Sequence, residues 1–541
     1  MIIGFNGHPE FGHDSGVAAI IDGKVSAVYE EERFSRQKKG RKSLPVAALR
    51  ALASTVGDSK VEAICYAGNP LHWNEDPEDY RRLVSQALRA SGLLGRLEQA
   101  PPLHFVDHHL AHAYSGFVYL PEQRRNEPTL HLVLDGRGEI CSGAAYRSHG
   151  SQIAPIWHLP ILDSMGLQYE AITQAIGFSW GHEGKTMGLA SYGAFDDVLA
   201  QAVSRKSSGM LLTADELTEH RADRGAIKAA FNATRAGRKQ ELAAQLFAPR
   251  DTFIRRAAVA AAGQAWLEQE VLEILQGLLR ENPGVRNVVM SGGVALNCTA
   301  NSKVQAVLDD AGIELFVPPC ASDTGLALGA AAFLALSSGG DVAPAEDAFL
   351  GIDAMSDLDL LRRRGFAARR TTVDEIAHRL AQGAIIGRIA GRAEIGPRAL
   401  GNRAILSTPA GVRIRDRINL LKGRESWRPL APILTAASAQ QVLTGPTDAY
   451  MLRTADLVDD PRMEAVRHVD GTTRAKIVQP HELGLAALMS AVAAESGLAA
   501  VLCTSFNGAG EPIVNSVIDA LLTAQRLGLT ALCGDDWILE L

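Results

Sequence analysis

The sequence predicts an α/β protein of two domains, the first of which contains a duplicated unit of strands and helices. Three observations lead to this fold class. The stretches from Gly4 to Ala27 and from Leu130 to Ile153 share one pattern of a strand, an acidic glycine-containing turn and further strands. From Val285 to Leu336, strand, glycine turn and helix alternate. The segment 337–344, SSGGDVAP, then has the composition of a linker.

The two copies of the repeated pattern account for the first strands of the chain. In the first copy, His13-Asp14-Ser15-Gly16 is the turn, Val17 to Ile21 is the next strand, and Asp22-Gly23 is a hairpin turn. In the second copy, His131 to Leu134 is a strand that leads into the turn Asp135-Gly136-Arg137-Gly138-Glu139. A duplicated β-rich unit with helices follows from this similarity.

A histidine-rich segment follows a short predicted strand, Leu103 to Val106. Asp107-His108-His109-Leu110-Ala111-His112 is predicted to begin a helix, and two imidazoles four residues apart on a helix can hold one metal ion. The alternative is a helix capped by Asp107 and followed by solvated histidines. The glutamate of a zinc-protease HExxH motif is missing. The spacing alone leaves the metal site and its alternative open.

Later glycine turns favour a phosphate site. Val285 to Met290 is predicted as a buried strand, Ser291-Gly292-Gly293 as a turn and Val294 to Val307 as a helix. Glu314 to Val317 is then another strand, and Gly325 to Leu336 another helix. Backbone N–H groups can approach an anion closely only where side chains are absent, as in such turns.

We place the domain boundary between the linker and about Leu360, which gives domains 1–350 and 351–541. Basic residues are dense beyond the boundary, and several are flanked by Gly or Pro instead of having acidic partners at helical spacing. Arginine and lysine in glycine-rich loops suit planar oxyanions such as phosphate, so we expect an anion pocket. The cluster comprises Arg388, Arg392, Arg398, Arg403, Lys422, Arg424, Arg428 and Arg474.

Composition narrows the class of protein. The chain of 541 residues is 47% hydrophobic and 21% charged, as globular proteins are. No apolar run reaches the roughly 18 to 20 residues needed to span a bilayer, and no signal peptide is recognisable, so we expect a cytoplasmic protein with no membrane partner. The six cysteines form no CxxC pair, which indicates reduced thiols. A net charge of −7 argues against nucleic acid as a partner, although Arg33 to Lys42 is locally basic.

Taken together, the motifs resemble the O-carbamoyltransferases of the NodU/CmcH type, which include enzymes that carbamoylate antibiotics and nodulation factors. The strings that carry this resemblance span nearly the whole chain in one order. They are HDSGVAAIIDGKV, EERFSRQK, DHHLAHA, LDGRGE, GHEGKTMGLASYG, SGGVALN, SDTGLALGAA, GPRALGNRAIL, KGRESWRPLAP, HVDGTTRAKIVQ and TSFNGAGEPIV.

The resemblance implies a first domain of the actin/hexokinase-like (ASKHA) fold, related to the tRNA threonylcarbamoyl-transfer domain, and a YrdC-like α/β second domain. It also implies a metal in the first domain, usually iron, held by the two histidines spaced four apart and by two aspartates of later glycine turns. The matching residues are His108, His112, Asp135 and Asp323. Fe²⁺ or another divalent metal is the expected cofactor, with Mg²⁺ as a further candidate, and family members are often homodimers.

The reaction that the resemblance implies has two stages. In the second domain, carbamoyl phosphate and ATP would give carbamoyl-adenylate, phosphate and pyrophosphate. In the first domain, a hydroxyl of a small-molecule acceptor, such as an antibiotic or another secondary metabolite, would take the carbamoyl group, and AMP would leave. The matching residues of the second domain are Lys422, Arg424, Arg474, Ser505 and Asn507.

In the first domain, the family residue suited to act as the base for the hydroxyl matches His13, whose alternative is a loop histidine bonded to backbone. Asn297 would bond the ribose or cap the following helix, and His109 would point away to a structural hydrogen bond. The residues expected to cradle the adenylate phosphate or approach the nucleotide are Lys185, Gly136, Arg137, Gly138, Gly292 and Gly293.

Three other functions compete with this one. A tRNA threonylcarbamoyl-type transferase would need a broad basic surface, which the net charge does not indicate. A metallopeptidase would need a general-base carboxylate next to the histidine pair. A non-catalytic nucleotide-binding regulatory scaffold would have no physical need for both a metal centre and a second phosphate pocket. The acceptor itself is not identified, and we expect residues 70–101 and 195–251 to line its pocket.

Overall fold

The computed structural model of the chain describes residues 1–57, 59–73, 75–93, 100–204, 237, 239–242, 252–353 and 358–541. These residues form a mixed α/β fold. Their contacts divide the chain into two compact units. The first unit comprises Met1–Ser26 and Lys42–Glu346, and the second comprises Ala27–Arg41 and Asp347–Leu541.

The first sheet has five strands in the order β3-β2-β1-β4-β5, and the last four residues of β3 are grouped with the second unit. β1 runs antiparallel to β2 and parallel to β4, and β4 runs parallel to β5. At the predicted hairpin turn between β2 and β3, Asp22 and Gly23 have φ of 49° and 73°, as a two-residue hairpin turn requires. The strands are β1 (Ile2–Asn6), β2 (Gly16–Ile21), β3 (Lys24–Glu30), β4 (Ala63–Ala67) and β5 (Leu103–Val106).

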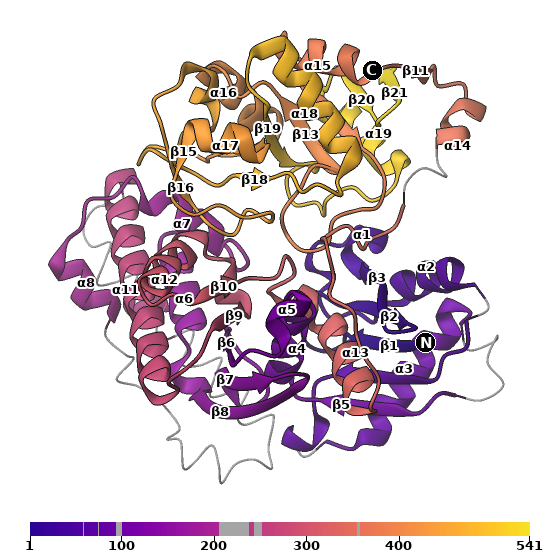
Figure 1. Cartoon of the computed structure of the whole chain (residues 1–541), viewed down its shortest axis with the longest axis vertical. Helices are drawn as coiled ribbons and strands as arrows, with labels where there is room; N and C mark the ends of the chain where they lie inside the picture. Colours follow the sequence, from indigo (N-terminus) through magenta and orange to yellow (C-terminus); the bar gives the residue numbers. More distant parts are fainter. Residues whose placement is uncertain are drawn as a thin grey trace. The chain divides into compact units, whose positions relative to one another are not determined.

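The second sheet repeats the first (Figure 1). Its order is β10-β9-β6-β7-β8, in which β6 is antiparallel to β7 and parallel to β9, and β9 is parallel to β10. β6 therefore corresponds to β1, β7 to β2 and β9 to β4. The shared order and directions are what the predicted duplication requires. The strands are β6 (Thr129–Leu134), β7 (Cys141–His149), β8 (Gln152–Pro160), β9 (Asn287–Ser291) and β10 (Glu314–Phe316).

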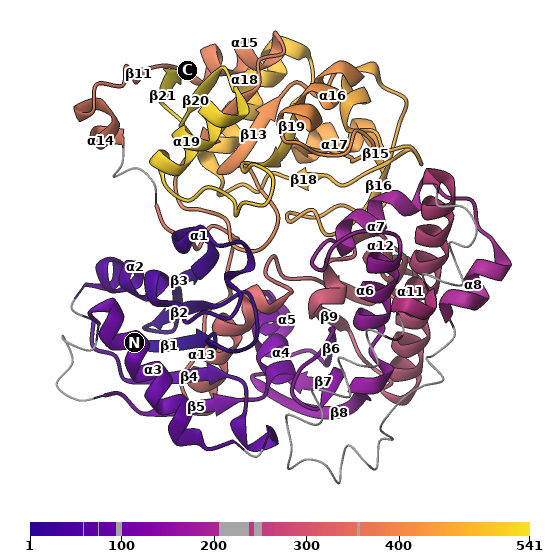
Figure 2. The ribbon, with the colours of Figure 1, turned by 180° about the vertical axis from the view of Figure 1, so that it is seen from behind.

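The helices of the first unit pack closely because small residues line their contacts. A Cβ atom on Gly4 of β1 would lie 1.7 Å from the Ala327 carbonyl oxygen of α13, and one on Gly329 of α13 would lie 1.7 Å from the Ala111 oxygen of α4. Long α11 contacts α6, α7, α8 and α12 (Figure 2). These helices are α4 (His108–Val118), α6 (Met165–Ala175), α7 (Glu183–Ala190), α8 (Asp197–Ser204), α11 (Phe253–Glu281), α12 (Cys298–Asp310) and α13 (Leu326–Ser337). The remaining helices are α2 (Val46–Val56), α3 (Pro77–Ser91) and α5 (Glu122–Arg125).

One expected helix of the first unit is interrupted. The sequence predicts a continuous helix from Val294 to Val307, but the structure has a 3-10 turn, η5 (Gly293–Leu296), before α12. Asn297 separates the two elements with extended backbone, and its side chain accepts a hydrogen bond from Ala300 N–H to cap α12. The capping interaction therefore overrides the helical pattern here.

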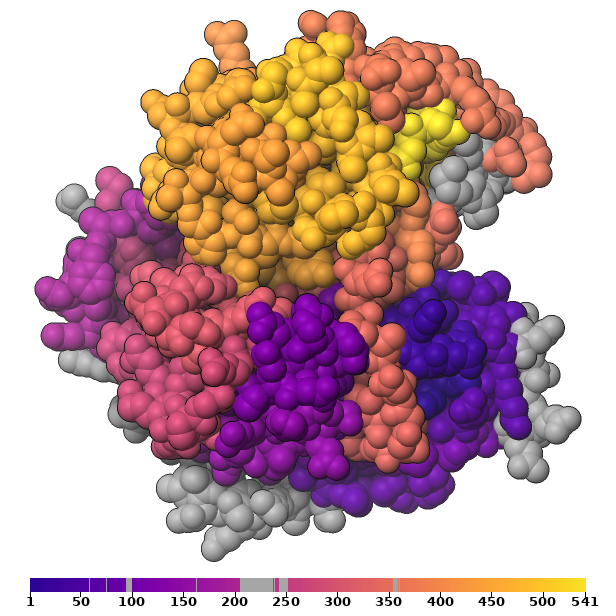
Figure 3. All heavy atoms as spheres, viewed as in Figure 1, coloured from indigo at the N-terminus to yellow at the C-terminus, as the bar shows by residue number. Residues whose placement is uncertain are grey.

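The predicted linker is ordered. After α13, the Ala343 N–H donates to Gly23 O and the Ala345 N–H donates to Val118 O. Figure 3 shows this segment, in salmon, at the surface between the indigo N-terminal residues and the purple residues around α4 and α5. The segment is thus held at the hairpin turn after β2 and at the end of α4.

The second unit is built on an eight-stranded sheet in the order β11-β21-β20-β12-β13-β19-β14-β18. Its core contains Phe506 and Trp537, and a Cβ on Gly387 would lie 2.5 Å from the Phe506 ring. The strands are β11 (Arg369–Arg370), β12 (Ile386–Ile389), β13 (Arg403–Ser407), β14 (Ala431–Leu434), β18 (Lys476–Ile477), β19 (Ala500–Ser505), β20 (Ala531–Cys533) and β21 (Trp537–Glu540). The helices are α14 (Leu358–Arg363), α15 (Val373–Ala381), α16 (Val412–Leu421), α17 (Ala436–Val442), α18 (Leu483–Ser496) and α19 (Val517–Leu527). A small sheet of β15 (Leu443–Thr444), β16 (Ala455–Leu457) and β17 (Thr472–Thr473) completes the unit.

The second unit includes a segment from the beginning of the chain. The sequence-based division at residue 350 placed all earlier residues in the first domain, whereas the contacts group Ala27–Arg41 with Asp347–Leu541. Charged residues of this segment, including Glu30 and Arg33, are buried. Among the described residues, we find no helix with the length and apolarity to cross a membrane.

Candidate functional site

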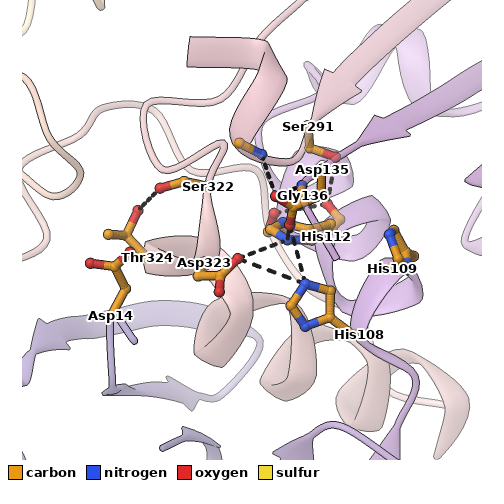
Figure 4. Close-up of polar contacts among 12 residues, drawn as sticks. Asp14, His108, His109, His112, Asp135, Gly136, Ser291, Ser322, Asp323 and Thr324 are labelled. Carbon is orange, nitrogen blue, oxygen red and sulfur yellow. Dashed lines mark hydrogen bonds and ion pairs between the residues drawn. The ribbon is translucent and has the colours of Figure 1, made fainter. Parts of the chain in front are cut away.

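Two histidines and two aspartates of the first unit come together from distant parts of the sequence. His108 and His112 project from α4, Asp135 follows β6, and Asp323 begins the 3-10 turn η6 (Asp323–Gly325) before α13. One ligand atom from each of the four residues lies within 4.8 Å of the others. Figure 4 shows both imidazoles facing the two carboxylates. These are the four residues that the sequence predicts as metal ligands.

The separations and the charges in this cluster favour a bound cation. His112 Nε2 lies 3.2 Å from Asp135 Oδ2 and 3.4 Å from Asp323 Oδ1, and His108 Nε2 lies 3.3 Å from Asp135 Oδ2. Burial disfavours the charged form of His112, but hydrogen bonds to the two carboxylates raise its pKa to about 9. Burial likewise opposes ionisation of Asp135, yet hydrogen bonds from both histidines hold its pKa well below the usual value. The carboxylates therefore stabilise positive charge at this point.

Neighbouring groups hold Asp135 and His112 of this cluster in place. The Gly136 N–H donates to Asp135 Oδ1 over 2.6 Å, and the Gly293 N–H donates to the same oxygen over 3.2 Å. Ser291 Oγ donates to His112 O. A Cβ on Gly293 would lie 2.9 Å from Asp135 Oδ1, so the glycine turn lets the backbone reach this carboxylate.

Helix α4 is capped by a residue other than the predicted one. Asp107 makes no side-chain capping hydrogen bond. Instead, buried Glu139 accepts from the His108 N–H, at 3.0 Å to Oε1 and 3.2 Å to Oε2, and from the Asn69 N–H at 3.0 Å. Asp107 accepts from Asn69 Nδ2. The alternative of solvated histidines after an Asp107 cap is therefore wrong, because His109 and His112 are also buried.

His109 points away from the cluster, as the sequence predicts (Figure 4). Its Nδ1 lies 3.4 Å from Cys141 Sγ, and burial lowers its pKa to about 3, so the ring is neutral. Gly138 packs directly on this ring, since a Cβ there would lie 2.3 Å from His109 Cε1. The contacts of Gly136 and Gly138 thus serve the cluster and its helix, and their role at a nucleotide stays a prediction.

His13 lies beside the same cluster. Its Nδ1 is 2.8 Å from Asp14 Oδ2 and 3.6 Å from Asp323 Oδ2, and its ring meets Trp180 edge-on at 5.1 Å. Asp14 is buried and has a φ of 52°, a backbone conformation that residues other than glycine rarely adopt. A carboxylate on Nδ1 leaves Nε2 as the nitrogen that could accept a proton.

The other residues of the first unit that are predicted to contact the nucleotide lie on different elements. Lys185 lies on α7 with its ammonium 5.4 Å from the centre of the Phe178 ring. Gly292 has a φ of 89°, and a Cβ on it would lie 2.2 Å from Leu134 O. Asn297 caps α12 and also bonds Gln264, which favours its capping alternative. The roles of Lys185, Arg137 and Gly292 at a nucleotide stay predictions.

In the second unit, Lys422 is buried at the end of α16 and reaches the end of β19. Its ammonium donates to Asn507 O and Asn507 Oδ1, each at 2.9 Å, and also to Ser505 O. Ser505 Oγ donates to Asn507 Oδ1 at 2.8 Å. The structure therefore brings together three of the residues that the family resemblance assigns to the second domain.

Three arginines join Lys422. Burial, and then the charges of Arg424 and Arg428, lower the pKa of Lys422 well below its usual value. Burial, then Arg428 and Arg474, lower the pKa of Arg424 to about 9. Arg424 donates to Thr504 Oγ1 at 3.1 Å. Like charges are gathered here at an energetic cost, which an anion bound among them would offset.

Other members of the predicted basic cluster have structural contacts instead. Arg403 donates to the carbonyl oxygens of Ile352, Ala390, Gly391, Asn402 and Asn515. Arg392 donates to Leu350 O and Gly351 O, and Arg388 pairs with Asp535 and donates to Gly401 O. The expectation of one pocket lined by all eight residues is therefore wrong for these three, because their donors are used within the fold.

Comparison with known proteins covers both units. The family model Carbamoyltransferase N-terminus matches residues 73–332, and Carbamoyltransferase C-terminus matches residues 377–540. Nodulation protein NolNO of Sinorhizobium fredii is 31% identical over 98% of this chain and 79% of its own length. The chain belongs to the carbamoyltransferase family.

A 3'-hydroxymethylcephem-O-carbamoyltransferase of Amycolatopsis lactamdurans is 34% identical to this carbamoyltransferase, over 50% of the chain and 53% of the relative. The enzyme is accordingly an O-carbamoyltransferase. Among solved structures, full-length HypF in its phosphate- and nucleotide-bound form is 12% identical, with a TM-score of 0.33 over 61% of this chain and 55% of HypF. A likeness of that size carries no argument about function.

Sequence reasoning missed two residues near the cluster of the carbamoyltransferase's first unit. Asp14 bonds His13, and Glu139 caps α4. Both lie in strings that carry the family resemblance, but neither residue type by itself signals these contacts. Of the segments expected to line the acceptor pocket, residues 74, 94–99, 205–236, 238 and 243–251 lie outside the described residues.

Proposed function

We propose that this O-carbamoyltransferase works in two stages that use ATP and carbamoyl phosphate. In the second unit, water hydrolyses carbamoyl phosphate to carbamate and phosphate. The carbamate oxygen then attacks the α-phosphorus of ATP, so that pyrophosphate leaves and carbamoyl-adenylate forms. In the first unit, an acceptor hydroxyl attacks the carbamoyl carbon, and AMP leaves.

The cation cluster of the second unit is the observation that carries the proposal. Besides burial, which is the largest cause, the charges of Arg424 and Arg428 lower the pKa of Lys422, and those of Arg428 and Arg474 lower the pKa of Arg424. An anion bound among these cations would offset their repulsion. The first stage brings two highly charged phosphate substrates together, and fixed cations can disperse their charge in the transition state. Ser505 and Asn507 hold the Lys422 ammonium, which gives it a defined position for this task.

In the first unit, we propose that His13 accepts the proton of the acceptor hydroxyl. Asp14 on Nδ1 fixes the ring and leaves Nε2 to accept the proton as the hydroxyl attacks. Asp323, 3.6 Å from His13 Nδ1, would stabilise the resulting imidazolium. Lys185 and the turns that contain Arg137 and Gly292 are the proposed contacts of the adenylate.

The donors of His108, His112, Asp135 and Asp323 fit a divalent transition metal. Two imidazoles and two carboxylates suit Fe²⁺ and leave positions open for further ligands, whereas Mg²⁺ prefers oxygen donors and suits the ATP phosphates. When bound, such a metal would supply positive charge close to the reacting phosphate or carbonyl oxygen. Gly136 and Gly293 fix the orientation of Asp135 for this role.

The matched sheets of the first unit support the actin/hexokinase-like fold, and a YrdC-like fold is proposed for the second unit. The acceptor is proposed to be a hydroxylated secondary metabolite such as an antibiotic, because one relative is named for a hydroxymethylcephem. All six cysteines are unpaired, which supports the cytoplasm as the compartment. Transfer to tRNA, binding without turnover and assembly as a homodimer are the alternatives left for experiment.

The first experiment incubates the protein with ATP and carbamoyl phosphate without an acceptor and measures pyrophosphate release, omitting each substrate in turn. We expect release to need both substrates and to be lost in Lys422→Ala. Lys60→Ala, which removes an exposed lysine of the first unit, is the matched control and should leave release unchanged. Release that does not depend on carbamoyl phosphate, in folded and metal-loaded protein, would refute the proposal and favour a non-catalytic scaffold.

A further inference from the structure

The segment Ala27–Arg41, called the strap below, belongs to the second unit although it follows β2 of the first unit in sequence. It contains the short helix α1 (Glu31–Ser35) and the 3-10 turn η1 (Lys38–Gly40). Glu30 and Arg33 are 6% and 4% exposed. Buried charges are costly unless they are paired and hydrogen-bonded, so the contacts of the strap must be specific.

The first anchor of the strap is Gly396, which lies in the loop GPRALGN. The Gly396 N–H donates to Glu30 Oε1 at 2.7 Å, and Arg33 Nη2 donates to Gly396 O at 2.8 Å. Arg33 also lies 3.6 Å from Glu30, so the two strap residues form an ion pair around the glycine. With a φ of 82°, Gly396 has a backbone conformation that favours glycine.

The second anchor is Arg36. Its Nη1 donates to Ile513 O at 2.7 Å and its Nη2 donates to Pro512 O at 3.0 Å, while Nε lies 3.8 Å from Asp519. Arg36 ends α1 with a φ of 60°, a left-handed conformation that residues other than glycine rarely adopt. The two-pronged contact of the guanidinium compensates for this strain.

A continuous set of contacts runs from the second anchor to Lys422. Pro512 and Ile513 end the loop that begins at Asn507, and Asn507 Nδ2 donates across this loop to Glu511 O at 2.7 Å. Asn507 in turn accepts two hydrogen bonds from the Lys422 ammonium. The position of the Lys422 ammonium therefore depends on the loop that Arg36 holds.

We propose that the strap is a working part of the anion pocket of the second unit, in which Arg36 is a positioning residue for Lys422. Arg36 fixes the carbonyl groups of Pro512 and Ile513, and the loop then presents Asn507 to the ammonium. The inference rests on the proposed function of the second unit. Lys38 of the strap supports it, because its charge adds to the effects of burial, Arg424 and Arg428 that lower the pKa of Lys422.

The test uses the full chain with Arg36→Ala and the conservative variant Arg36→Lys. Loss of the charged hydrogen bonds should raise KM for carbamoyl phosphate in pyrophosphate release by about tenfold, with kcat changed less. Arg36→Lys should give an intermediate KM. Amide hydrogen exchange of residues 507–514, measured without substrates, should be faster in Arg36→Ala than in the wild type.

Arg50→Ala is the matched control, because Arg50 also donates to a backbone carbonyl, Ala90 O, but lies on α2 of the first unit. It should leave both KM and the exchange of residues 507–514 unchanged. A merely structural role for Arg36 would lower the folded fraction at unchanged KM. An Arg36→Ala variant with wild-type KM and wild-type exchange would overturn the proposal. If the wild type itself fails to release pyrophosphate, the proposed function is refuted, and hydrogen exchange still decides whether Arg36 holds the loop.

Discussion

The two clusters of charged residues in this carbamoyltransferase differ in how their charges are balanced. In the first unit, two histidines face two carboxylates, and each charge has a partner of opposite sign within the site. In the second unit, burial and then the charges of neighbouring arginines lower the pKa values of Lys422 and Arg424. The first arrangement can hold a cation without further help, whereas a bound anion would offset the repulsion in the second.

This difference also distinguishes two roles of arginine in the second unit, one within the fold and one in the cation cluster. Arg403 satisfies five backbone carbonyl oxygens within the fold, whereas Arg428 lies near other cations, with Glu425 Oε2 4.0 Å from its Nη1. A buried arginine is therefore no sign of ligand binding by itself. What distinguishes the two is whether its donors end on the protein or on a group that the protein does not supply.

The largest expected effect comes from exchanging arginines of these two kinds for methionine. Arg403→Met leaves buried carbonyl oxygens without donors and should lower the free energy of unfolding by about 3–5 kcal/mol. Arg428→Met removes one of the crowded cations, so it should raise KM for carbamoyl phosphate about tenfold or more without loss of stability. Chemical denaturation and steady-state kinetics measure the two effects.

The comparison fails if the two variants behave alike. Destabilisation by Arg428→Met would mean that the fold already satisfies its guanidinium. A folded and fully stable Arg403→Met would mean that its five contacts contribute little.

The next effect concerns the site of the first unit. His112→Ala removes one of the four clustered donors and should weaken metal binding by more than about a hundredfold, since losing even a supporting contact of a metal ligand costs 10–100-fold. Pyrophosphate release without an acceptor should stay within about twofold of the wild type. Metal content by mass spectrometry and the release assay give the two readouts.

His104→Ala is the matched control, because His104 is an exposed histidine on β5 close to the same helix in sequence. The His104→Ala variant should have the metal content of the wild type. Full metal content in His112→Ala would remove the metal assignment, and loss of pyrophosphate release would show that the two stages are not separable.

Sequence reasoning predicted the cluster of the first unit better than the pocket of the second. The spacing of His108 and His112 places them on one face of a helix, but by itself it left the metal site and its alternative open. Asp135 and Asp323 were assigned as ligands through the family resemblance. Glu139 could not be assigned as the cap of α4, because its contact with His108 joins residues that only the folded sheet brings together.

In the second unit, the sequence indicated too many anion-binding residues. Arg388, Arg392 and Arg403 lie close to glycine in the sequence just as Arg424 does, but they bind backbone carbonyl groups. The strap was also missed as part of this unit, although its basic character was noted. Such long-range contacts leave no local pattern in the sequence, because they depend on the tertiary fold and not on the residues adjacent in sequence.

A smaller effect is expected at the packing that supports the first site. Gly138→Ala would place a Cβ 2.3 Å from the His109 ring, so the helix or the turn must shift. We expect a loss of about 1–3 kcal/mol in the free energy of unfolding. Gly184→Ala on α7, where nothing lies within 4 Å, should be neutral or stabilising by up to about 1 kcal/mol. Thermal unfolding compares the two, and equal stability of both variants would contradict the close packing of His109.

The smallest effect distinguishes two buried histidines of the first unit. Burial lowers the pKa of His131 to about 3, whereas the carboxylates raise that of His112 to about 9. Unfolding exposes His131 to its ordinary pKa of about 6.5, so the unfolded chain binds more protons below that pH, and His131 makes the protein less stable as pH falls from about 6.5 toward 3. His112 has the opposite sign: without a metal, its contribution is present below about 6.5 and is lost as pH rises through 9.

His131→Gln isolates the first of these contributions, because glutamine can still bond Ser148 Oγ, which lies 2.8 Å from His131 Nε2. Between pH 6 and 5, the unfolding free energy of the wild type should fall faster than that of the variant by about 1 kcal/mol per pH unit, close to the limit of 1.36 for one proton. Denaturation at both pH values measures the difference in slope. Parallel curves would mean that the His131 ring is already protonated in the folded protein, and that burial without a carboxylate does not keep a histidine neutral at this position.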